Sequence, residues 1–253
     1  MIIWLASYPK SGNTWVRSMV SSLLYSNDGN FNEIKESWIL AQDKINLDNQ
    51  IKILKTHQGK YTVDKNSFTN NQNTLATIYI VRDPRTLITS ISNHYTLSID
   101  GACDFLTTPQ IIGNTKKWED KETGMQCLLG KWSDHYRSWT RNKNNLLLIK
   151  YEDLIQNPEN EFKKIIYFLK KYLDIKTDDS KNKKILETTS FENLKKMEQK
   201  GLFKENVLNK KDDSKVNFFH LGPANNWKNN INENAKNKIE KNFYDEMREL
   251  KYL

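Results

Sequence analysis

The sequence YPKSGNTW, at residues 8–15, gathers side chains that are well suited to binding an anion. Lys10 supplies a positive charge, Ser11 and Thr14 supply hydroxyl donors, and Gly12 lets the backbone approach a ligand closely. An apolar run precedes this turn and a helical pattern follows it, so the turn lies at a helix N-terminus. Unpaired N–H groups and the positive end of the helix dipole favour negative charge there. The segment therefore predicts a site for a phosphate-type anion.

A second group of side chains could move a proton. Lys55, Thr56 and His57 follow the apolar run that begins at Ile51. A neutral imidazole can take the proton from a hydroxyl group as that group attacks. A single histidine is more often structural, but the place of His57 at the end of a predicted strand favours a catalytic role.

A third group could hold another anion. Arg82 directly follows the apolar run at residues 75–81, and Asp83 and Pro84 resemble the N-cap and first residue of a helix. Ser90 lies eight residues beyond Arg82, two turns into that helix. A ligand along this helix could therefore contact both side chains.

Four apolar runs predict the strands that position these groups, at residues 2–6, 51–56, 75–81 and 145–150. Helical spacing of apolar residues begins at Asn13, and further helices are predicted at residues 123–142, 158–172 and 232–250. Residues 101–124 are predicted to be long and irregular, and 177–184 to be an exposed break. Ligands bind beyond the carboxyl ends of strands in open parallel sheets. We therefore predict an α/β fold, with a central parallel sheet flanked by helices and a P-loop-like anion-binding turn.

Composition limits the class of protein. A chain of 253 residues is ordinary for one α/β domain, so we expect a single domain over residues 1–253. No apolar run is long enough to span a membrane, the start lacks the features of a signal peptide, and two cysteines make no disulfide framework. These features predict a cytoplasmic protein with no membrane partner.

The net charge of +8 also invites a nucleic-acid interpretation, but only six of the 39 basic residues are Arg. Base and phosphate recognition relies on arginine geometry, and no nucleic-acid-binding motif is recognisable. We expect no nucleic-acid partner.

The segments described above resemble the sulfotransferases that use 3′-phosphoadenosine 5′-phosphosulfate (PAPS). YPKSGNTW resembles their 5′-phosphosulfate loop, which implies donor contacts from Lys10, Ser11, Gly12, Asn13, Thr14 and Trp15. KTH matches the family's Lys-Thr-His motif, whose histidine is the general base, and this implies that role for His57. Arg82 and Ser90 match the pair that holds the 3′-phosphate.

Three later segments extend the resemblance. YEDL implies that Tyr151 contacts the adenine, and the Thr-Ser-Phe segment implies that Ser190 and Phe191 approach the nucleotide. Trp15 and Phe191 could enclose the adenine between them. Ser190 has an alternative role as the N-cap of the next helix.

The segment FFHLGPANNWKNNI resembles the family's last nucleotide-binding segment. His220 and Gly222 fall in that site, but His220 and Leu221 replace an Arg-Lys pair and Asn225 and Asn226 replace Gly-Asp. One cation expected near the 3′-phosphate is therefore missing. The family's dimer motif is also absent, so the resemblance does not predict an oligomeric state.

The resemblance implies transfer of a sulfuryl group from PAPS to a hydroxyl or amine acceptor, with the 3′,5′-bisphosphate of adenosine (PAP) as product and no metal. Lys10 would stabilise the leaving oxygen, Lys55 the sulfuryl oxygens, and His57 would take the acceptor's proton. The acceptor, a small molecule or glycan, would meet residues from 27–49, 58–73 and 101–124.

Two other function classes remain as alternatives. A small-molecule or nucleotide kinase would need a Gly-Lys-Ser/Thr loop and magnesium ligands, and neither is found. A non-catalytic nucleic-acid-binding protein is the third possibility. His94 and His135 are interpreted as structural.

Overall fold

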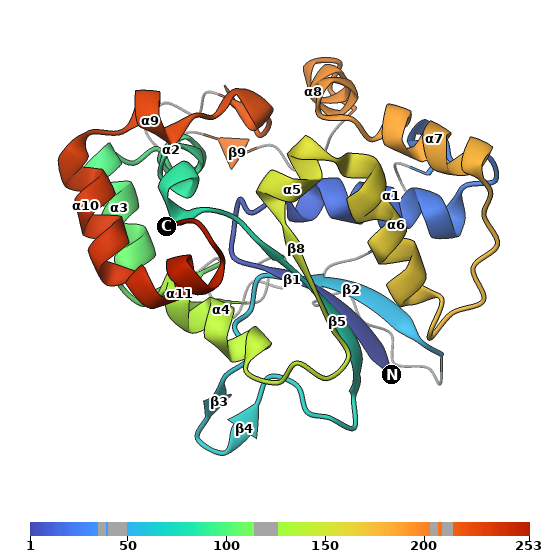
Figure 1. Cartoon of the computed structure of the whole chain (residues 1–253), viewed down its shortest axis with the longest axis horizontal. Coiled ribbons are helices and arrows are strands. Elements are labelled where there is room, and N and C mark those ends of the chain that lie inside the picture. The colour runs from blue at the N-terminus through green and yellow to red at the C-terminus, as the bar shows by residue number, and fades with distance from the viewer. Residues whose placement is uncertain (35–38, 40–49, 114–125, 203–206, 209–214) are drawn as a thin grey trace.

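The computed structural model describes residues 1–34, 39, 50–113, 126–202, 207–208 and 215–253. Its centre is a four-stranded sheet in the order β2-β1-β5-β8 (Figure 1). These strands are β1 (Ile2–Ser7), β2 (Lys52–Thr56), β5 (Thr74–Val81) and β8 (Leu146–Lys150). All three pairings are parallel, so the four carboxyl ends meet at one edge. The four predicted strands and the parallel sheet are confirmed.

Both faces of the sheet are covered by helices, as the continuous apolar character of β1 requires. Ile3 and Leu5 pack with residues of α1 (Asn13–Tyr25), α6 (Pro158–Leu169) and α7 (Asp179–Thr188). Trp4 and Ala6 alternate with them and pack with residues of α2 (Pro84–Tyr95), α4 (Trp132–Thr140) and α10 (Glu233–Asn242). The site-bearing loops therefore follow strands that are held from both sides.

The remaining elements are short or lie outside this sandwich. The helices are η1 (Phe31–Glu33), α3 (Ile99–Thr107), α5 (Tyr151–Gln156), α8 (Phe191–Gln199), η3 (Gly222–Ala224), α9 (Trp227–Asn230) and α11 (Tyr244–Glu249). The strands pair as β3 (Thr62–Val63) with β4 (Asn66–Ser67), β6 (Gln110–Ile112) with β7 (Cys127–Gly130), and β9 (Val207–Leu208) with β10 (Lys215–Val216). Among the described residues, no helix is long and apolar enough to cross a bilayer.

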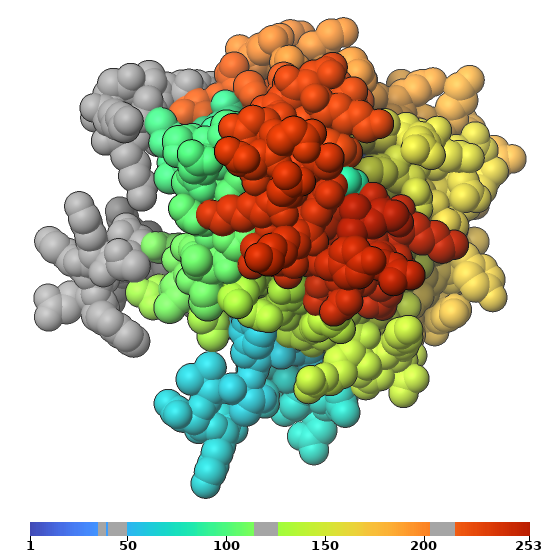
Figure 2. Space-filling view, turned by 60° about the vertical axis from the view of Figure 1, so that its left-hand side comes forward, coloured from blue at the N-terminus to red at the C-terminus, as the bar shows by residue number. Residues whose placement is uncertain are grey.

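The C-terminal helices close one face of the molecule. Figure 2 shows them in orange and red, spread over the green segments of α2 and α3. Ile239, Phe243 and Met247 join the apolar cluster that contains Leu87 and Trp132. The single helix predicted over residues 232–250 is wrong in one respect, because Phe243 lies outside helical geometry between α10 and α11.

Three other predictions of local structure are corrected. Residues 101–124 are not irregular throughout, since they contain most of α3 and all of β6, while 114–125 lie outside the described residues. Residues 123–142 are not one helix, because β7 precedes α4. Residues 177–184 are not a break, because Asp178 caps α7 by accepting a hydrogen bond from the backbone N–H of Lys181.

Candidate active site

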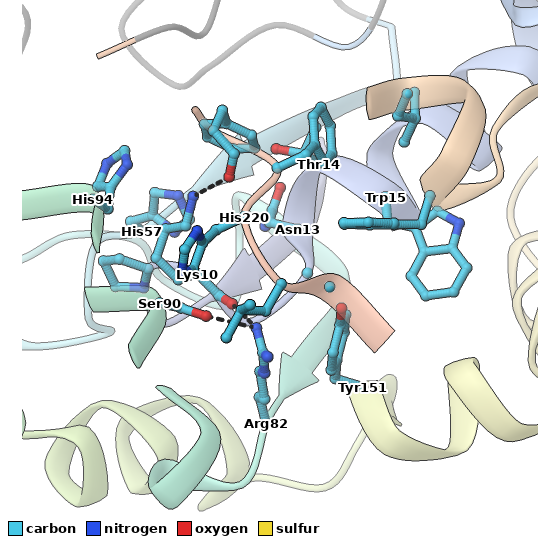
Figure 3. A pocket seen from close by; sticks show the side chains of 18 of the residues that line it. Lys10, Asn13, Thr14, Trp15, His57, Arg82, Ser90, His94, Tyr151 and His220 are labelled. Atoms are coloured by element: carbon cyan, nitrogen blue, oxygen red, sulfur yellow. Dashed lines mark hydrogen bonds between the residues drawn. The ribbon is translucent and has the colours of Figure 1, made fainter. Parts of the chain in front are cut away.

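A cavity of about 310 Å³ lies beyond the carboxyl ends of the central strands. Thirteen predicted residues line it: Lys10, Gly12, Asn13, Thr14, Trp15, Lys55, His57, Arg82, Ser90, Tyr151, Phe191, His220 and Gly222. Figure 3 shows Trp15 and Tyr151 at one side of this cavity and His57 and His94 at the other. Two predicted residues do not line it. Ser11 is a fully buried residue of the loop between β1 and α1, and Ser190 caps α8 by accepting a hydrogen bond from the backbone N–H of Asn193.

The loop between β1 and α1 has an unusual backbone that its sequence makes possible. Gly12 has φ +98°, and a Cβ there would lie 2.6 Å from the Tyr151 ring, so only glycine fits without displacement. Lys10 also has a positive φ, +66°. Strain of this kind persists where surrounding contacts hold it. The hydrogen bond from Arg82 to the carbonyl of Lys10, described below, is such a contact.

Three buried polar atoms in this loop and the first turn of α1 have no hydrogen-bond partner within the described part of the chain. They are Ser11 Oγ, Asn13 Oδ1 and Trp15 Nε1. Native proteins leave few buried polar atoms unpaired, and a functional role is one explanation for such an exception. Ser11 Oγ and the backbone N–H groups at the helix N-terminus are donors that fit the phosphosulfate end of PAPS, whereas Asn13 Oδ1 can only accept.

The Lys10 side chain reaches a segment more than two hundred residues away. Its Nζ donates a hydrogen bond to the carbonyl oxygen of Phe218 (3.2 Å) and lies 3.6 Å from the centre of the Phe218 ring. The ammonium group is therefore held at the cavity edge by a carbonyl and an aromatic face, both of which favour a cation.

Arg82 is a buried cation with neutral partners. Its side chain donates to Ser90 Oγ (3.2 Å), Thr86 Oγ1 (2.9 Å) and the carbonyl oxygen of Lys10 (3.1 Å). The residue is 5% exposed, and among the described residues no carboxylate forms a salt bridge with it. The nearby Glu152 carboxylate accepts hydrogen bonds from the Asp83 backbone and from Tyr252, not from Arg82. A buried charge without a salt bridge is costly, so this guanidinium is suited to an anionic ligand.

The carboxylate next in sequence does not neutralise Arg82. Asp83 forms its salt bridge with Arg85 (2.7 Å), which also pairs with Glu240. Asp83 additionally accepts the backbone N–H of Arg85 and so caps α2, as predicted. Asp83 is thus occupied by Arg85 and does not pair with Arg82.

His57 is oriented by the end of β1. Its Nδ1 lies 2.8 Å from the carbonyl oxygen of Ser7 and 3.3 Å from Ser7 Oγ. Asn13 Nδ2 in turn donates to Ser7 Oγ (3.1 Å), which joins the anion loop to the histidine. Burial, and next the positive charge of Lys55, lower the pKa of His57 well below 6.5. The imidazole is therefore neutral at pH 7 and able to accept a proton.

Aromatic rings form the opposite end of the cavity. The Trp15 and Tyr151 rings meet edge to face at 6.0 Å, and the Arg82 guanidinium lies 4.2 Å from the centre of the Tyr151 ring. Gly222 has φ +54°, and a Cβ there would lie 2.1 Å from the Phe191 ring. Glycine at this position thus lets the chain close against Phe191. An aromatic base such as adenine fits a pocket with such walls.

Several lining residues were not predicted. His94, interpreted from the sequence as structural, lines the cavity, and so do Tyr95, Ile112, Phe218 and Phe219. His94 lies one helical turn beyond Ser90, so the same helical spacing that joined Arg82 to Ser90 could have found it. Burial, with Lys10 and Lys55, lowers the pKa of His94 to about 3.

The loops expected to meet an acceptor contribute little in the described part of the chain. Of residues described within 27–49, 58–73 and 101–124, Ile112 alone lines the cavity. Within the same described residues, no group of three or more His, Cys, Asp or Glu side chains is arranged to hold a metal ion.

Comparison with known proteins gives one family. The family model described as "Sulfotransferase domain" matches residues 2–251. Sulfotransferase 1B1 of Mus musculus is 28% identical over 253 residues, which cover 90% of this chain and 76% of the relative. Sulfotransferase 1C2 of Rattus norvegicus is 26% identical over 249 residues, with the same coverage.

Solved structures agree in fold. The crystal structure of mouse sulfotransferase SULT7A1 complexed with PAP has a TM-score of 0.64 at 23% identity and covers 98% of this chain and 84% of that one. Retinol dehydratase in a complex with retinol and PAP has a TM-score of 0.67 at 18% identity, covering 97% and 81%. These matches do not favour the kinase alternative. The chain therefore belongs to the sulfotransferase domain family and is an enzyme of PAPS-dependent sulfuryl transfer.

Proposed function

We propose that the cavity binds PAPS with its phosphosulfate on the β1–α1 loop and its adenine at the aromatic end. The donors of residues 10–14 meet the phosphosulfate, Arg82 and Ser90 meet the 3′-phosphate, and Trp15, Tyr151 and Phe191 surround the adenine. The proposal includes contacts from Ser11, Ser190, His220 and Gly222. It is supported by the convergence of most of these residues on one cavity and by the unpaired polar atoms of the loop.

The proposed reaction is an in-line displacement at sulfur. A new bond forms between sulfur and the acceptor oxygen or nitrogen while the bond from sulfur to the 5′-phosphate oxygen breaks. Lys10 stabilises the negative charge that develops on that leaving oxygen, and Lys55 stabilises the sulfuryl oxygens. His57 takes the acceptor's proton on Nε2.

The hydrogen bonds of His57 support this role. Its Nδ1 faces the Ser7 carbonyl, and no hydrogen bond joins Nε2 to any residue in the described segments. Because a carbonyl only accepts, Nδ1 carries the ring proton and Nε2 presents its lone pair. The neutral ring thus has the tautomer that a general base requires.

The acceptor is proposed to be a hydroxyl or amine of a small molecule. The curated relatives support this class, since their names include an amine sulfotransferase from Oryctolagus cuniculus. A glycan acceptor remains a second possibility within the same chemistry. We also propose a single domain over residues 1–253, which the family match over residues 2–251 supports, and a cytoplasmic location.

One observation carries the donor assignment: Arg82 is a buried guanidinium whose hydrogen-bond partners are all neutral. The test is thermal shift and calorimetry of the purified chain with PAP, ATP and an oligonucleotide. We expect stabilisation by PAP without magnesium. Stabilisation only by ATP with magnesium, or only by the oligonucleotide, would overturn the donor assignment. Transfer from labelled PAPS to a panel of alcohols, phenols and amines then identifies the acceptor.

A further inference from the structure

His135 is a fully buried histidine with hydrogen bonds at both ring nitrogens. Its Nε2 lies 3.0 Å from the carbonyl oxygen of His57, and its Nδ1 lies 2.8 Å from the hydroxyl group of Tyr79. The carbonyl oxygen can only accept, so Nε2 carries the proton and Nδ1 accepts from the Tyr79 hydroxyl. Tyr79 therefore donates a hydrogen bond to His135, and His135 donates one to the backbone carbonyl of His57.

The position of His57 in the chain explains why its carbonyl needs such a partner. The ladder between β1 and β2 ends at the pair Ala6–Thr56, so His57 is the first residue beyond it. The next carbonyl, of Gln58, accepts a hydrogen bond from Trp139 Nε1 (2.9 Å). His135 and Trp139 are four residues apart on α4 and thus lie on one helix face.

The same face of α4 also binds the backbone of Lys60, three residues after His57. Ser138 Oγ accepts the backbone N–H of Lys60 (2.9 Å). Side chains of one helix therefore contact three backbone positions within residues 57–60. The segment that leaves the edge of the central sheet is fixed by these contacts, together with the hydrogen bond from the Gly59 N–H to the carbonyl of Leu128 in β7 (2.9 Å).

We infer that Tyr79 and His135 are positioning residues for sulfuryl transfer: they fix the backbone carbonyl of His57 and thereby the direction in which its Nε2 faces the cavity. The inference rests on the proposed function, in which His57 is the general base. Neither Tyr79 nor His135 lines the cavity, so neither is a catalytic residue.

The chemistry of the pair makes its role geometric. Burial lowers the pKa of His135 to about 4 and raises the pKa of Tyr79 well above 10. Both groups are therefore neutral from about pH 5 to pH 9. A backbone carbonyl cannot take up and pass on a proton, so the pair orients His57 and does not relay charge to it.

Two substitutions at position 135 separate the hydrogen bond from packing. His135→Leu removes the donor, whereas His135→Gln places an amide N–H close to the position of Nε2. We expect His135→Leu to lower kcat by about 10- to 100-fold with little change in the Kd for PAP, because misplacing a reacting group costs about this much. His135→Gln should recover most of the loss.

Tyrosine substitutions give a matched pair. Tyr79→Phe removes the hydrogen bond to His135 Nδ1 and should lower kcat by about two- to tenfold. Tyr136→Phe is the control, since Tyr136 is also buried but stacks on Trp132 and makes no hydrogen bond to His135. Its kcat should equal that of the unmodified enzyme. Melting temperature and PAP binding show whether each variant is folded.

The pH dependence of kcat/KM is a further measurement, and a general loss of stability does not shift it. His57 faces Lys55 from β2, His94 from α2 and His135 from α4, and its burial dominates its low pKa. Loosening the carbonyl in His135→Leu should expose the ring, so the acid limb of kcat/KM should move to higher pH. His135→Gln should keep the original limb.

Two outcomes distinguish the inference from the function on which it rests. If His57→Ala transfers sulfate as fast as the unmodified enzyme, the assignment of His57 as base fails. If His57→Ala is inactive but folded His135→Leu keeps both kcat and the acid limb, the positioning inference alone fails. Adding His135→Leu to His57→Ala should leave the residual rate unchanged.

Discussion

Nδ1 of His57 lies 2.8 Å from the carbonyl oxygen of Ser7, the last residue of β1. This contact joins two neighbouring strands at their carboxyl ends, because β1 pairs with β2 in the sheet. It also assigns the ring proton to Nδ1, since a carbonyl only accepts. The anion loop begins one residue after Ser7. The residue proposed as base and the loop proposed to bind the donor are thus tied to the same strand end.

Replacing His57 with Ala tests the role of the base. PAP affinity should stay close to that of the unmodified enzyme, because Arg82 and the loop hold the nucleotide. Turnover should fall by about 10²–10⁴-fold, the usual contribution of a positioned acid or base. Calorimetry and initial rates on the same preparation measure both. A variant that loses stability but keeps its activity per folded molecule would assign His57 to packing.

Replacing Arg82 with Ala tests the 3′-phosphate site. PAP binding should weaken by about ten- to a hundredfold, the range expected for a charged hydrogen bond. Adenosine 5′-phosphosulfate, which lacks the 3′-phosphate, should lose much less. Comparing the two ligands by calorimetry controls for the contact between Arg82 and the carbonyl of Lys10, because a distorted loop would weaken both. Equal losses would contradict the assignment.

The sheet and the site edge were predictable because each core strand is an apolar run that ends at a polar residue. Lys55, Arg82 and Tyr151 stand at those ends, and parallel pairing brings such ends together. Local spacing sufficed for Ser90 as well, since it lies on the helix that follows Arg82. These parts of the site follow from the local spacing of residues and from the rule that the carboxyl ends of parallel strands meet at one edge.

The errors occurred where local signals conflict. α7 has few apolar residues, with Ile185 buried near its end, so its charged sequence indicates an exposed break. α3 begins after the capping residue Ser98, but Gly101 within it weakened the helical pattern. In both cases the N-capping residue, Ser98 or Asp178, is the sequence signal that indicates a helix. Packing against distant elements, which the sequence does not display, stabilises these helices.

Some lining residues could not be predicted because they come from distant segments. Phe218 reaches the cavity through its contact with Lys10, 208 residues earlier in the chain. The C-terminal segment is itself anchored to α2, where Asn225 accepts from Thr89 and donates to the carbonyl of Thr86. Nothing in local periodicity indicates such a contact.

Replacing Lys10 with Ala tests the stabilisation of the leaving oxygen. PAPS binding should weaken, and kcat at saturating donor should fall by about 10²-fold or more, because charge builds on that oxygen during the reaction. Lys163→Ala is a suitable control, since Lys163 lies on the exposed face of α6 and pairs with Glu159 there. An unchanged kcat for the Lys10 variant would remove it from the mechanism.

The buried histidines predict how stability depends on pH. The pKa of His135 is about 4 in the folded protein and near 6.5 when unfolded, so the unfolded chain binds the proton first as pH falls. The stabilisation is thus complete above about pH 6.5 and is lost between there and about pH 4. Urea unfolding should show this decline, and His135→Gln should flatten it. A slope unchanged in the variant would show that His135 does not titrate on unfolding.

Lys55 provides a test of the electrostatics around the base. Its positive charge is the second cause, after burial, of the low pKa of His57. His57 acts as a base only when neutral, so the acid limb of kcat/KM follows its pKa. Lys55→Gln removes the charge while keeping a polar side chain, and the pKa of His57 should rise toward 6.5. The acid limb should therefore move to higher pH, in addition to any fall in kcat from weaker stabilisation of the sulfuryl oxygens. Lys60→Gln serves as the control, because Lys60 lies beyond the strand end and is not among the groups that lower this pKa. A limb that stays in place for Lys55→Gln, in a variant that still binds PAP, would show that His57 is not the group that titrates.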